Sequence, residues 1–520
     1  MKKFPITCLL LVLVESSRLD MEKVCKFSNK IFSCKICCCE NPYSIRCDSI
    51  MLETESNSPI VLHLDSSHFD GIQSITNLLI DLTFSNVNLQ IDQKLFTKMS
   101  DLTALTLVKL TGMISVPDLS NQIKLEELTI SESGLQKIDP EFCFTNRNLR
   151  KIDFSENVLK TEQLANLFNN CDQLNNLDLA YNNLNSLQGM FTYVSSLVLL
   201  NLDHNYIEKI GSNDLDFLID LEELSISNNR LNQIGEKAFF SLNKIKKLDL
   251  SRNYLESFSD VDMISLEMID LSRNKLKKID ADFFLHKTKL KKAVLAVNHL
   301  ESENLTGIFR SACEELNHLD LSENNLKLLK NIFNESLKLM ILKLDNNKIE
   351  NITENDFKNL PFLVHVSLSG NKLSYIHKKA FDNMSNLKHL DLSRNSLKHL
   401  PEKSIAYASI ESFYIGENKK LLEFPDDKQF NSLKVLKVTY PYHCCQFIKN
   451  FAVSTYIETK ESSDYVFETN VNVTEFHEYN DTDEPIHAQP YYPDMISNTH
   501  IRNVSCSPEP DPFQPCIILF

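Results

Sequence analysis

Residues 387–397 read LKHLDLSRNSL, and this run of spaced leucines followed by an asparagine decides the fold of the chain. The pattern LxxLxLxxNxL returns as LNNLDLAYNNL at 174–184, as LEELSISNNRL at 221–231 and as LNHLDLSENNL at 316–326. Self-similarity at a fixed period of this length indicates an array of stacked repeats. The pattern asparagine recurs every 21 to 26 residues, at Asn157, Asn182, Asn205, Asn229, Asn253, Asn274, Asn298, Asn324, Asn347, Asn371, Asn395 and Asn418.

Weaker copies extend the array at both ends and bring it to about seventeen repeats. Ser67, Val87, Leu110 and Ser133 take the asparagine position before Asn157, and Pro441 takes it after Asn418. Each LxLxx segment predicts a short strand whose inward leucines pack against those of the neighbouring repeats. The asparagine side chain is expected to be buried and to pair with backbone groups. The sequence therefore predicts an α/β leucine-rich repeat solenoid with a curved, concave parallel sheet and cysteine-rich caps at both ends.

A second apolar stripe and two longer repeats belong to the opposite, convex side. Phenylalanines four or five positions after an isoleucine are interpreted as core, namely Phe96, Phe142, Phe239, Phe283, Phe357 and Phe381. The longer repeats, 161–174 and 302–316, predict a helical turn with Thr161 or Ser302 as its N-cap. Cys171 and Cys313 hold equivalent positions in them and are expected to be small buried thiols.

Composition excludes several classes of function. The net charge of -16 argues against a nucleic-acid partner, because neutralising phosphates needs a basic face. Only 9 of the 520 residues are glycine, and the sequence contains no GxGxxG, GxxxxGK[ST], HExxH or GxSxG motif. We therefore expect neither an enzyme nor a cofactor.

The chain starts with features of a secreted protein. Lys2 and Lys3 precede an apolar run at 6–14, which predicts a signal peptide over residues 1–16. Residues 17–58 then predict an N-terminal cap, in which Cys34, Cys37, Cys39 and Cys47 have the spacing CxxCxCx7C, while Cys25 and Cys38 remain to pair with each other. A zinc site is the rival interpretation of clustered cysteines, but an oxidising compartment favours disulfides. The repeats occupy 59–441.

Residues 442–520 predict a cysteine-rich hinge with an acidic insert. Cys444 and Cys445 are expected to pair with Cys506 and Cys516, with the partners unassigned. Between residues 454 and 494 there are ten acids and one base, which is typical of a flexible linker or of a tethered binding segment. Cys143, Cys171 and Cys313 lie between the caps, so at least one of the 13 cysteines left after residue 16 is expected to be free or intermolecular.

The hinge carries a family resemblance. YPYHCCQF at 440–447 and CSPEPDPFQPC at 506–516 resemble the hinge of leucine-rich repeat G-protein-coupled receptors, and the repeat number resembles the branch of the R-spondin and bursicon receptors. The resemblance implies an extracellular ectodomain that captures a secreted protein ligand, either a cystine-knot hormone or an R-spondin-like factor. The family continues into a membrane-spanning seven-helix domain that this sequence does not contain. A secreted decoy, or a matrix or adhesion protein, is the alternative.

Three kinds of surface site follow from the sequence. N-x-[ST] sequons predict N-glycans at some of Asn304, Asn334, Asn351, Asn383, Asn472, Asn480 and Asn503. Tyr479, in the acidic stretch EFHEYNDTDE, is a candidate for sulfation. Because no sequon precedes Asn304, the first half of the concave face is the expected ligand surface, and its acidic strip would attract a basic partner. A solvated strip without a ligand is the alternative interpretation. The strip consists of Glu127, Asp153, Asp178, Asp203, Glu223, Asp249 and Asp270.

Overall fold

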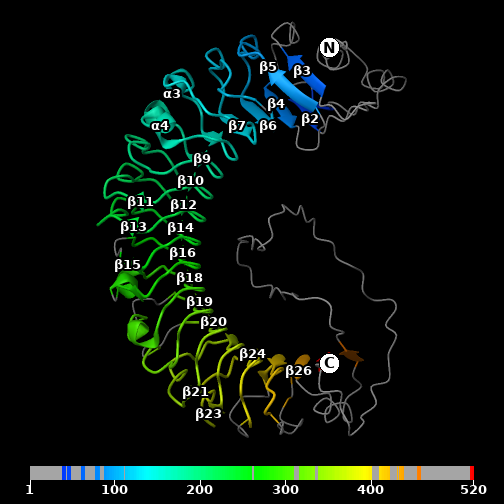
Figure 1. Cartoon of the computed structure of the whole chain (residues 1–520), viewed down its shortest axis with the longest axis vertical. Helices are drawn as coiled ribbons and strands as arrows, with labels where there is room; N and C mark the ends of the chain where they lie inside the picture. Colours follow the sequence, from blue (N-terminus) through cyan, green and yellow to red (C-terminus); the bar gives the residue numbers. More distant parts are fainter. Residues whose placement is uncertain are drawn as a thin grey trace.

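A computed structural model shows the chain as a curved solenoid whose strands line the inner side of an arc (Figure 1). It describes residues 38–41, 44–48, 60–64, 76–81, 87–110, 112–259, 263–280, 282–309, 315–333, 338–400, 409–421, 430, 432–438, 454–457 and 516–519. Within these residues no helix is long and apolar enough to cross a membrane.

The inner side is a single sheet of 20 strands among the described residues. Sixteen of them are the repeat strands, which pair in parallel and in register from each repeat to the next. They are β4 (Asn77–Asp81), β6 (Ala104–Val108), β7 (Glu127–Ser131), β8 (Lys151–Asp153), β9 (Asn176–Asp178), β10 (Leu199–Asn201), β12 (Glu223–Ser225), β14 (Lys247–Asp249), β16 (Met268–Asp270), β18 (Lys292–Val294), β19 (His318–Asp320), β20 (Ile341–Lys343), β22 (His365–Ser367), β24 (His389–Asp391), β25 (Ser412–Tyr414) and β26 (Val435–Val438).

The other four strands of this sheet close its two ends. At the first end, β1 (Cys38–Asn41) forms an antiparallel pair with β2 (Ser44–Asp48), and β2 joins β4. At the other end, β28 (Cys516–Leu519) runs antiparallel between β26 and β27 (Ser454–Ile457). Capping strands of this kind cover apolar edges that a bare solenoid would expose. Four of the cysteines predicted to pair lie in these strands, namely Cys38, Cys39, Cys47 and Cys516. The others, Cys25, Cys34, Cys37, Cys444, Cys445 and Cys506, lie outside the described residues, so the disulfides of both caps stay a prediction.

Four short parallel pairs form apart from the inner sheet. They are β3 (Ile60–Leu64) with β5 (Val87–Ile91), β11 (Lys209–Ile210) with β13 (Gln233–Ile234), β15 (Ser257–Phe258) with β17 (Lys278–Ile279), and β21 (Asn351–Ile352) with β23 (Tyr375–Ile376). The first pair corrects the predicted start of the array. Val87 begins β5 and so does not take the asparagine position, and the segment before Ser67 forms β3 instead of an inner strand. Sixteen repeat strands are described, one fewer than predicted.

The core confirms the two predicted apolar stripes. In the three-residue strands the middle side chain is buried, whereas the first and third side chains are mostly half-exposed. All twelve pattern asparagines and all six predicted phenylalanines are buried. Neighbouring rings touch along the convex side, as with Phe284 and Phe309, whose centroids are 4.9 Å apart. Asparagine and phenylalanine thus hold opposite sides of one continuous core.

The described helical turns are short and lie on the convex side (Figure 1). They are α3 (Phe142–Thr145), α4 (Thr161–Leu164), η2 (Leu167–Asn170), η3 (Phe283–His286) and η4 (Ser302–Leu305). The predicted N-cap role of Thr161 and Ser302 is wrong, because each residue starts its helix as the first helical residue. Their hydroxyls instead accept backbone N–H groups of the next repeat, Asn185 and Ser186 for Thr161, Lys327 and Leu328 for Ser302.

Candidate functional site

The concave sheet presents two parallel rows of side chains, at the first and third residue of each repeat strand. In-register pairing places Lys151 beside Asn176 in the first-position row and Asp153 beside Asp178 in the third-position row. The buried middle residues anchor both rows to the core. Variable side chains therefore project from a rigid surface, which suits recognition of another protein.

The structure brings most of the predicted acidic strip onto this face, but in two rows. Asp153, Asp178, Asp249 and Asp270 share the third-position row, where Asn201 and Ser225 separate Asp178 from Asp249. Glu127 and Glu223 lie in the first-position row. Asp203 lies in neither row, because it follows β10 by two residues.

Each third-position aspartate caps the backbone of its own repeat. Its carboxylate accepts the N–H two residues further on, at 3.0 Å for Ser155 on Asp153 and at 2.8 Å for Ser272 on Asp270. Asn201 caps Asp203 in the same way at 3.1 Å, so the cap needs an acceptor oxygen and not a charge. The aspartates therefore have a structural role that is sufficient to explain their recurrence in LDLS segments.

Asp203 performs this capping for its neighbour. The third position of β12 is Ser225, whose side chain is too short to cap Ser227. The Asp203 carboxylate reaches across from the preceding repeat and accepts the Ser227 N–H and the Ser225 hydroxyl, both at 2.6 Å. These two hydrogen bonds connect successive repeats.

A second aspartate caps the following repeat in the same way later in the array. The third position of β22 is Ser367, and Asp345 of the preceding repeat accepts its hydroxyl together with the Ser369 N–H. In both three-residue strands whose third residue is serine, β12 and β22, an aspartate of the previous repeat supplies the cap.

The buried cap at Asp203 should make stability depend on pH. Burial raises the pKa of Asp203 to about 7, from an ordinary value of 3.8. A raised pKa in the folded state means that this group's contribution is fully present below pH 3.8 and is lost as the pH rises through 7. Asp203→Asn keeps the acceptor oxygen and removes the titration. Relative to this variant, the free energy of unfolding of the wild type should fall by about 2 kcal/mol between pH 5 and pH 8.

Chemical unfolding of both proteins at the two pH values measures this difference, because titrating groups that do not interact with Asp203 cancel; Asp249 and Asp178 interact with it. A difference between wild type and variant that does not change with pH would contradict the raised pKa of Asp203.

An ion pair neutralises one member of the strip. The Glu223 carboxylate lies 2.9 Å from the Lys247 ammonium of the next strand. Burial raises the pKa of Asp178, Asp249 and Asp270. Burial thus disfavours the charged form of these three carboxyl groups.

Sequence reasoning missed the character of the second half of this face. From β18 to β24 the first-position row reads Lys292, His318, Ile341, His365 and His389 and carries no acid. Burial, with nearby Lys292 and Lys343, lowers the pKa of His318 to about 3. Burial, with His389 and Lys343, lowers that of His365 to about 4, so both rings are neutral at pH 7. The signal was available, since these residues occupy the strand position of Glu127 and Glu223.

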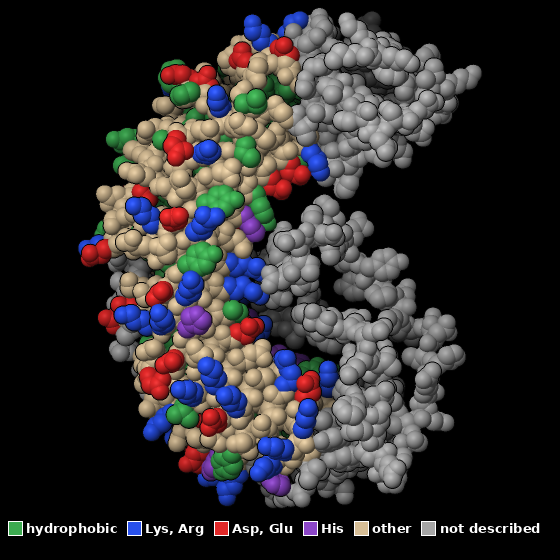
Figure 2. All heavy atoms as spheres, viewed as in Figure 1, with side chains coloured by type: hydrophobic (Ala, Val, Ile, Leu, Met, Phe, Trp, Pro, Cys, Tyr) green, Lys and Arg blue, Asp and Glu red, His purple; other side chains and the backbone are tan. Residues whose placement is uncertain are grey.

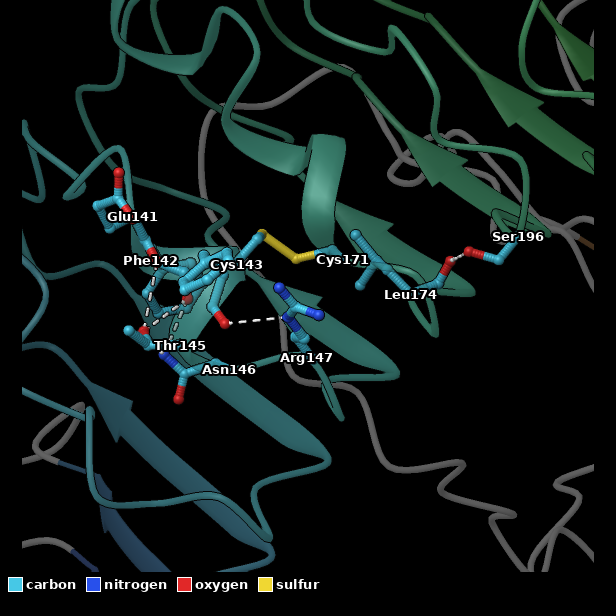
Figure 3. Close-up of a disulfide and its surroundings, with 10 residues drawn as sticks. Glu141, Phe142, Cys143, Thr145, Asn146, Arg147, Cys171, Leu174 and Ser196 are labelled. Carbon is cyan, nitrogen blue, oxygen red and sulfur yellow. Dashed lines mark hydrogen bonds between the residues drawn. A yellow bond between two sulfur atoms is a disulfide. The ribbon is translucent and has the colours of Figure 1, made fainter.

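A disulfide on the convex side also escaped prediction. Cys143 of α3 and Cys171, which follows η2, are bonded with their Cα atoms 4.9 Å apart (Figure 3). Cys171 is thus not the small buried thiol that its repeat position suggested, and Cys313 lies outside the described residues. The available signal was two cysteines on the convex segments of successive repeats, in a chain whose first residues predict secretion. In the described part of the chain, no three His, Cys, Asp or Glu residues are grouped to hold a metal ion.

Three of the seven sequons lie among the described residues, and two of these are exposed. Asn304 and Asn383 sit on the outside of the arc, whereas Asn351 is half-buried in β21. We expect glycans at Asn304 and Asn383, and less at Asn351, because the transferring enzyme needs an accessible side chain. Site-resolved mass spectrometry of secreted protein, before and after enzymatic deglycosylation, measures the occupancy; unmodified Asn304 and Asn383 would contradict it. Asn334, Asn472, Asn480, Asn503 and Tyr479 lie outside the described residues.

Comparison with known proteins agrees with this geometry. The leucine rich repeat model matches residues 219–276 and 363–419, and the BspA type leucine rich repeat region matches 63–198. The leucine-rich repeat-containing G-protein coupled receptor 5 of Rattus norvegicus is 31% identical over 134 residues, which are 26% of this chain and 14% of the receptor. Lumican of Gallus gallus is 34% identical over 198 residues, 36% of this chain and 56% of lumican. The chain thus spans 14% and 56% of the lengths of these two curated relatives.

Solved structures show the same fold. A leucine-rich repeat protein of Leptospira interrogans aligns with a TM-score of 0.56 and 20% identity over 71% of this chain and 95% of its own. The plant peptide hormone receptor RGFR1, in complex with RGF2, aligns with a TM-score of 0.50 and 19% identity over 74% of this chain and 66% of its own. Together with the in-register inner sheet and the buried asparagines, these matches show that the chain has the fold of a leucine-rich repeat solenoid.

Proposed function

We propose that the chain is the ligand-binding ectodomain of a leucine-rich repeat G-protein-coupled receptor and acts outside the cell. Its ligand would be a secreted protein, a cystine-knot hormone or an R-spondin-like factor, held on the concave face. The similarity to a receptor of this class and the hinge segments CC and CSPEPDPFQPC support the proposal. No catalytic group is needed for this function.

The observation that carries the proposal is the row of aspartates on the first half of the face. Four of them, on β8, β9, β14 and β16, project from a sheet that no sequon interrupts before Asn304. Each uses one oxygen for its cap, and a carboxylate has a second oxygen. In Asp178 that second oxygen accepts the Asn201 side-chain amide at 3.0 Å, so it is the second oxygens of Asp153, Asp249 and Asp270 that can meet a basic ligand. An acidic row of this kind raises the on-rate of a basic partner more than its affinity.

The test removes charge without removing the caps. Asp249→Asn with Asp270→Asn keeps the acceptor oxygens, as Asn201 does naturally. Binding to one R-spondin-like factor and one cystine-knot hormone is measured at low and at high salt. We expect roughly tenfold weaker binding at low salt and a smaller salt dependence.

The matched control is Asp320→Asn with Asp391→Asn. These residues make the same caps on the second half of the face, with N–H donors at 2.9 Å and 2.8 Å. If both double variants weakened ligand binding equally, the acidic row of the first half would not be the binding surface. Failure of the wild type to bind either ligand class would overturn the proposed function.

A matrix or decoy role is the second candidate, favoured by the similarity to lumican. A matrix protein should remain with the detergent-extracted matrix of the cells that secrete it, whereas a receptor ectodomain or a decoy should be recovered from the medium. The distribution of the chain between these two fractions separates a matrix role from the receptor and decoy roles.

A further inference from the structure

One lateral edge of the solenoid carries a surface that the concave strip does not include. The residue before each pattern asparagine adopts a left-handed backbone, with φ of 54° at Tyr181, 53° at His204 and 54° at Arg252 and Arg273. This repeated turn aligns equivalent side chains in an inner row along the rim. The residues just after the pattern asparagines form an outer row beside it, with Tyr206, Arg230, Tyr254 and Lys275. We call these eight residues the Tyr/Arg edge.

Aromatic and cationic side chains contact one another along this edge. The Tyr181 and His204 rings stack with centroids 3.9 Å apart. The Arg230 guanidinium lies 4.5 Å from the Tyr206 ring centre, and the Lys275 ammonium lies 4.7 Å from that of Tyr254. On the face shown in Figure 2, hydrophobic and basic side chains alternate along this part of the arc. Such contacts hold long side chains in place before a partner arrives.

The edge is positive on a chain that is negative overall. Its two rows have ten positions between Tyr181 and Lys275, and these hold four Arg or Lys and no Asp or Glu, although the chain has a net charge of -16. The same positions in the next five repeats, from Val297 to Ser396, hold no Tyr, Phe or Trp, although they hold three Lys or Arg and one Glu. The tyrosines are therefore local to these five repeats, whereas basic residues recur at these positions along the array.

Exposure and chemistry both suit a protein interface. Tyr181, Tyr206 and Tyr254 are 44%, 44% and 48% exposed. Tyr and Arg are enriched at interfaces and among the residues that dominate their affinity. No sequon precedes Asn304, so no predicted glycan falls on these repeats.

We propose that the Tyr/Arg edge binds an extended acidic segment of a partner protein. Strands lie about 4.8 Å apart, so five repeats span roughly 20 Å, the length of about six extended residues. Carboxylates of such a segment would meet Arg230, Arg252, Arg273 and Lys275 in turn, while its apolar side chains would pack on the tyrosines. The three tyrosines favour a peptide over a sulfated polysaccharide. The charge of Arg252 acts on Asp249 of the concave strip. The test variant therefore changes Arg230 and Lys275 instead, so that the two proposals fail separately.

The experiment selects ligands without assuming their sequence. A phage library of random linear peptides is selected on the intact secreted chain, and the enriched peptides are synthesised and their affinities measured. The test variant is Arg230→Glu with Lys275→Glu. The matched control is Lys348→Glu with Lys372→Glu, which makes the same change of charge at exposed outer-row positions of later repeats. Secretion and thermal melting check the folding of both variants.

We expect enrichment of peptides rich in Asp and Glu that contain an apolar residue. Their affinity should fall at least tenfold with the test variant and less than twofold with the control. Tyr206→Ala should also weaken binding, which charge alone would not predict. No enrichment, enrichment without acidic bias, or equal loss with both variants would overturn the proposal. The proposal would also be overturned if no acidic peptides were enriched and the chain bound heparin in a way that the test variant abolished. That result would assign the edge to a polysaccharide.

Discussion

Asn253→Leu is expected to prevent secretion of most of the chain and to destabilise the rest by about 2–5 kcal/mol, since several buried backbone groups lose their partner at about 1–3 kcal/mol each. The Asn253 amide donates to the carbonyls of Ile226, Leu250 and Ser251, at 2.8, 3.1 and 3.1 Å. Its oxygen accepts the Leu231 N–H at 2.9 Å. Leucine has a similar volume but can satisfy none of these groups.

The loss should spread beyond one repeat, because the bonds of Asn253 reach the preceding repeat as well as its own. Secretion and the free energy of unfolding in urea measure the effect. Asn232→Leu, at an exposed site in the neighbouring segment, is the matched control and should cost less than about 0.5 kcal/mol. Comparable losses in both variants would show that added hydrophobic surface, and not the buried amide, is responsible.

The template could be predicted from the sequence because its positions repeat. Twelve asparagines and a stripe of phenylalanines recur at near-constant spacing, and such periodicity reports burial directly. The acidic strip shows the limit of this reasoning. Asp178 and Asp203 look alike in LDL and LDH segments, but Asp178 lies four residues before its pattern asparagine and Asp203 only two. Asp178 caps its own repeat, whereas Asp203 caps the next, and only the three-dimensional stack shows that its partner is the segment after Ser225.

The ends and the convex side were harder to predict for related reasons. Near the first cap the pattern loses its asparagine, and apolar alternation alone does not distinguish an inner strand from β3 or β5. The hydroxyls of Thr161 and Ser302 bind the following repeat, so a local helix-capping rule could not describe them. The histidines of the second half of the concave face are at predictable positions, but their neutrality follows from burial beside lysines.

The Cys143–Cys171 disulfide leads to the second large prediction. Both sulfurs belong to buried side chains, and the bond joins the convex segments of successive repeats across a sequence separation of 28 residues. A loop of this length corresponds to about 3–4 kcal/mol in the loop-entropy model. In a solenoid each repeat is supported only by its neighbours, so the loss should appear first as opening of the repeats between the N-terminal cap and β9.

Cys143→Ala with Cys171→Ala should therefore lower the free energy of unfolding by about 2–4 kcal/mol. Amide exchange should accelerate in β7 and β8 while β20 to β24 keep their protection. Alanine adds a small cavity at each site, and Phe333→Leu, a buried convex substitution far from the bond, controls for that cost. Each single variant should match the double variant, because either one breaks the bond. If the double variant is as stable as the wild type, or if non-reducing peptide maps find both thiols free, the bond does not hold these repeats together.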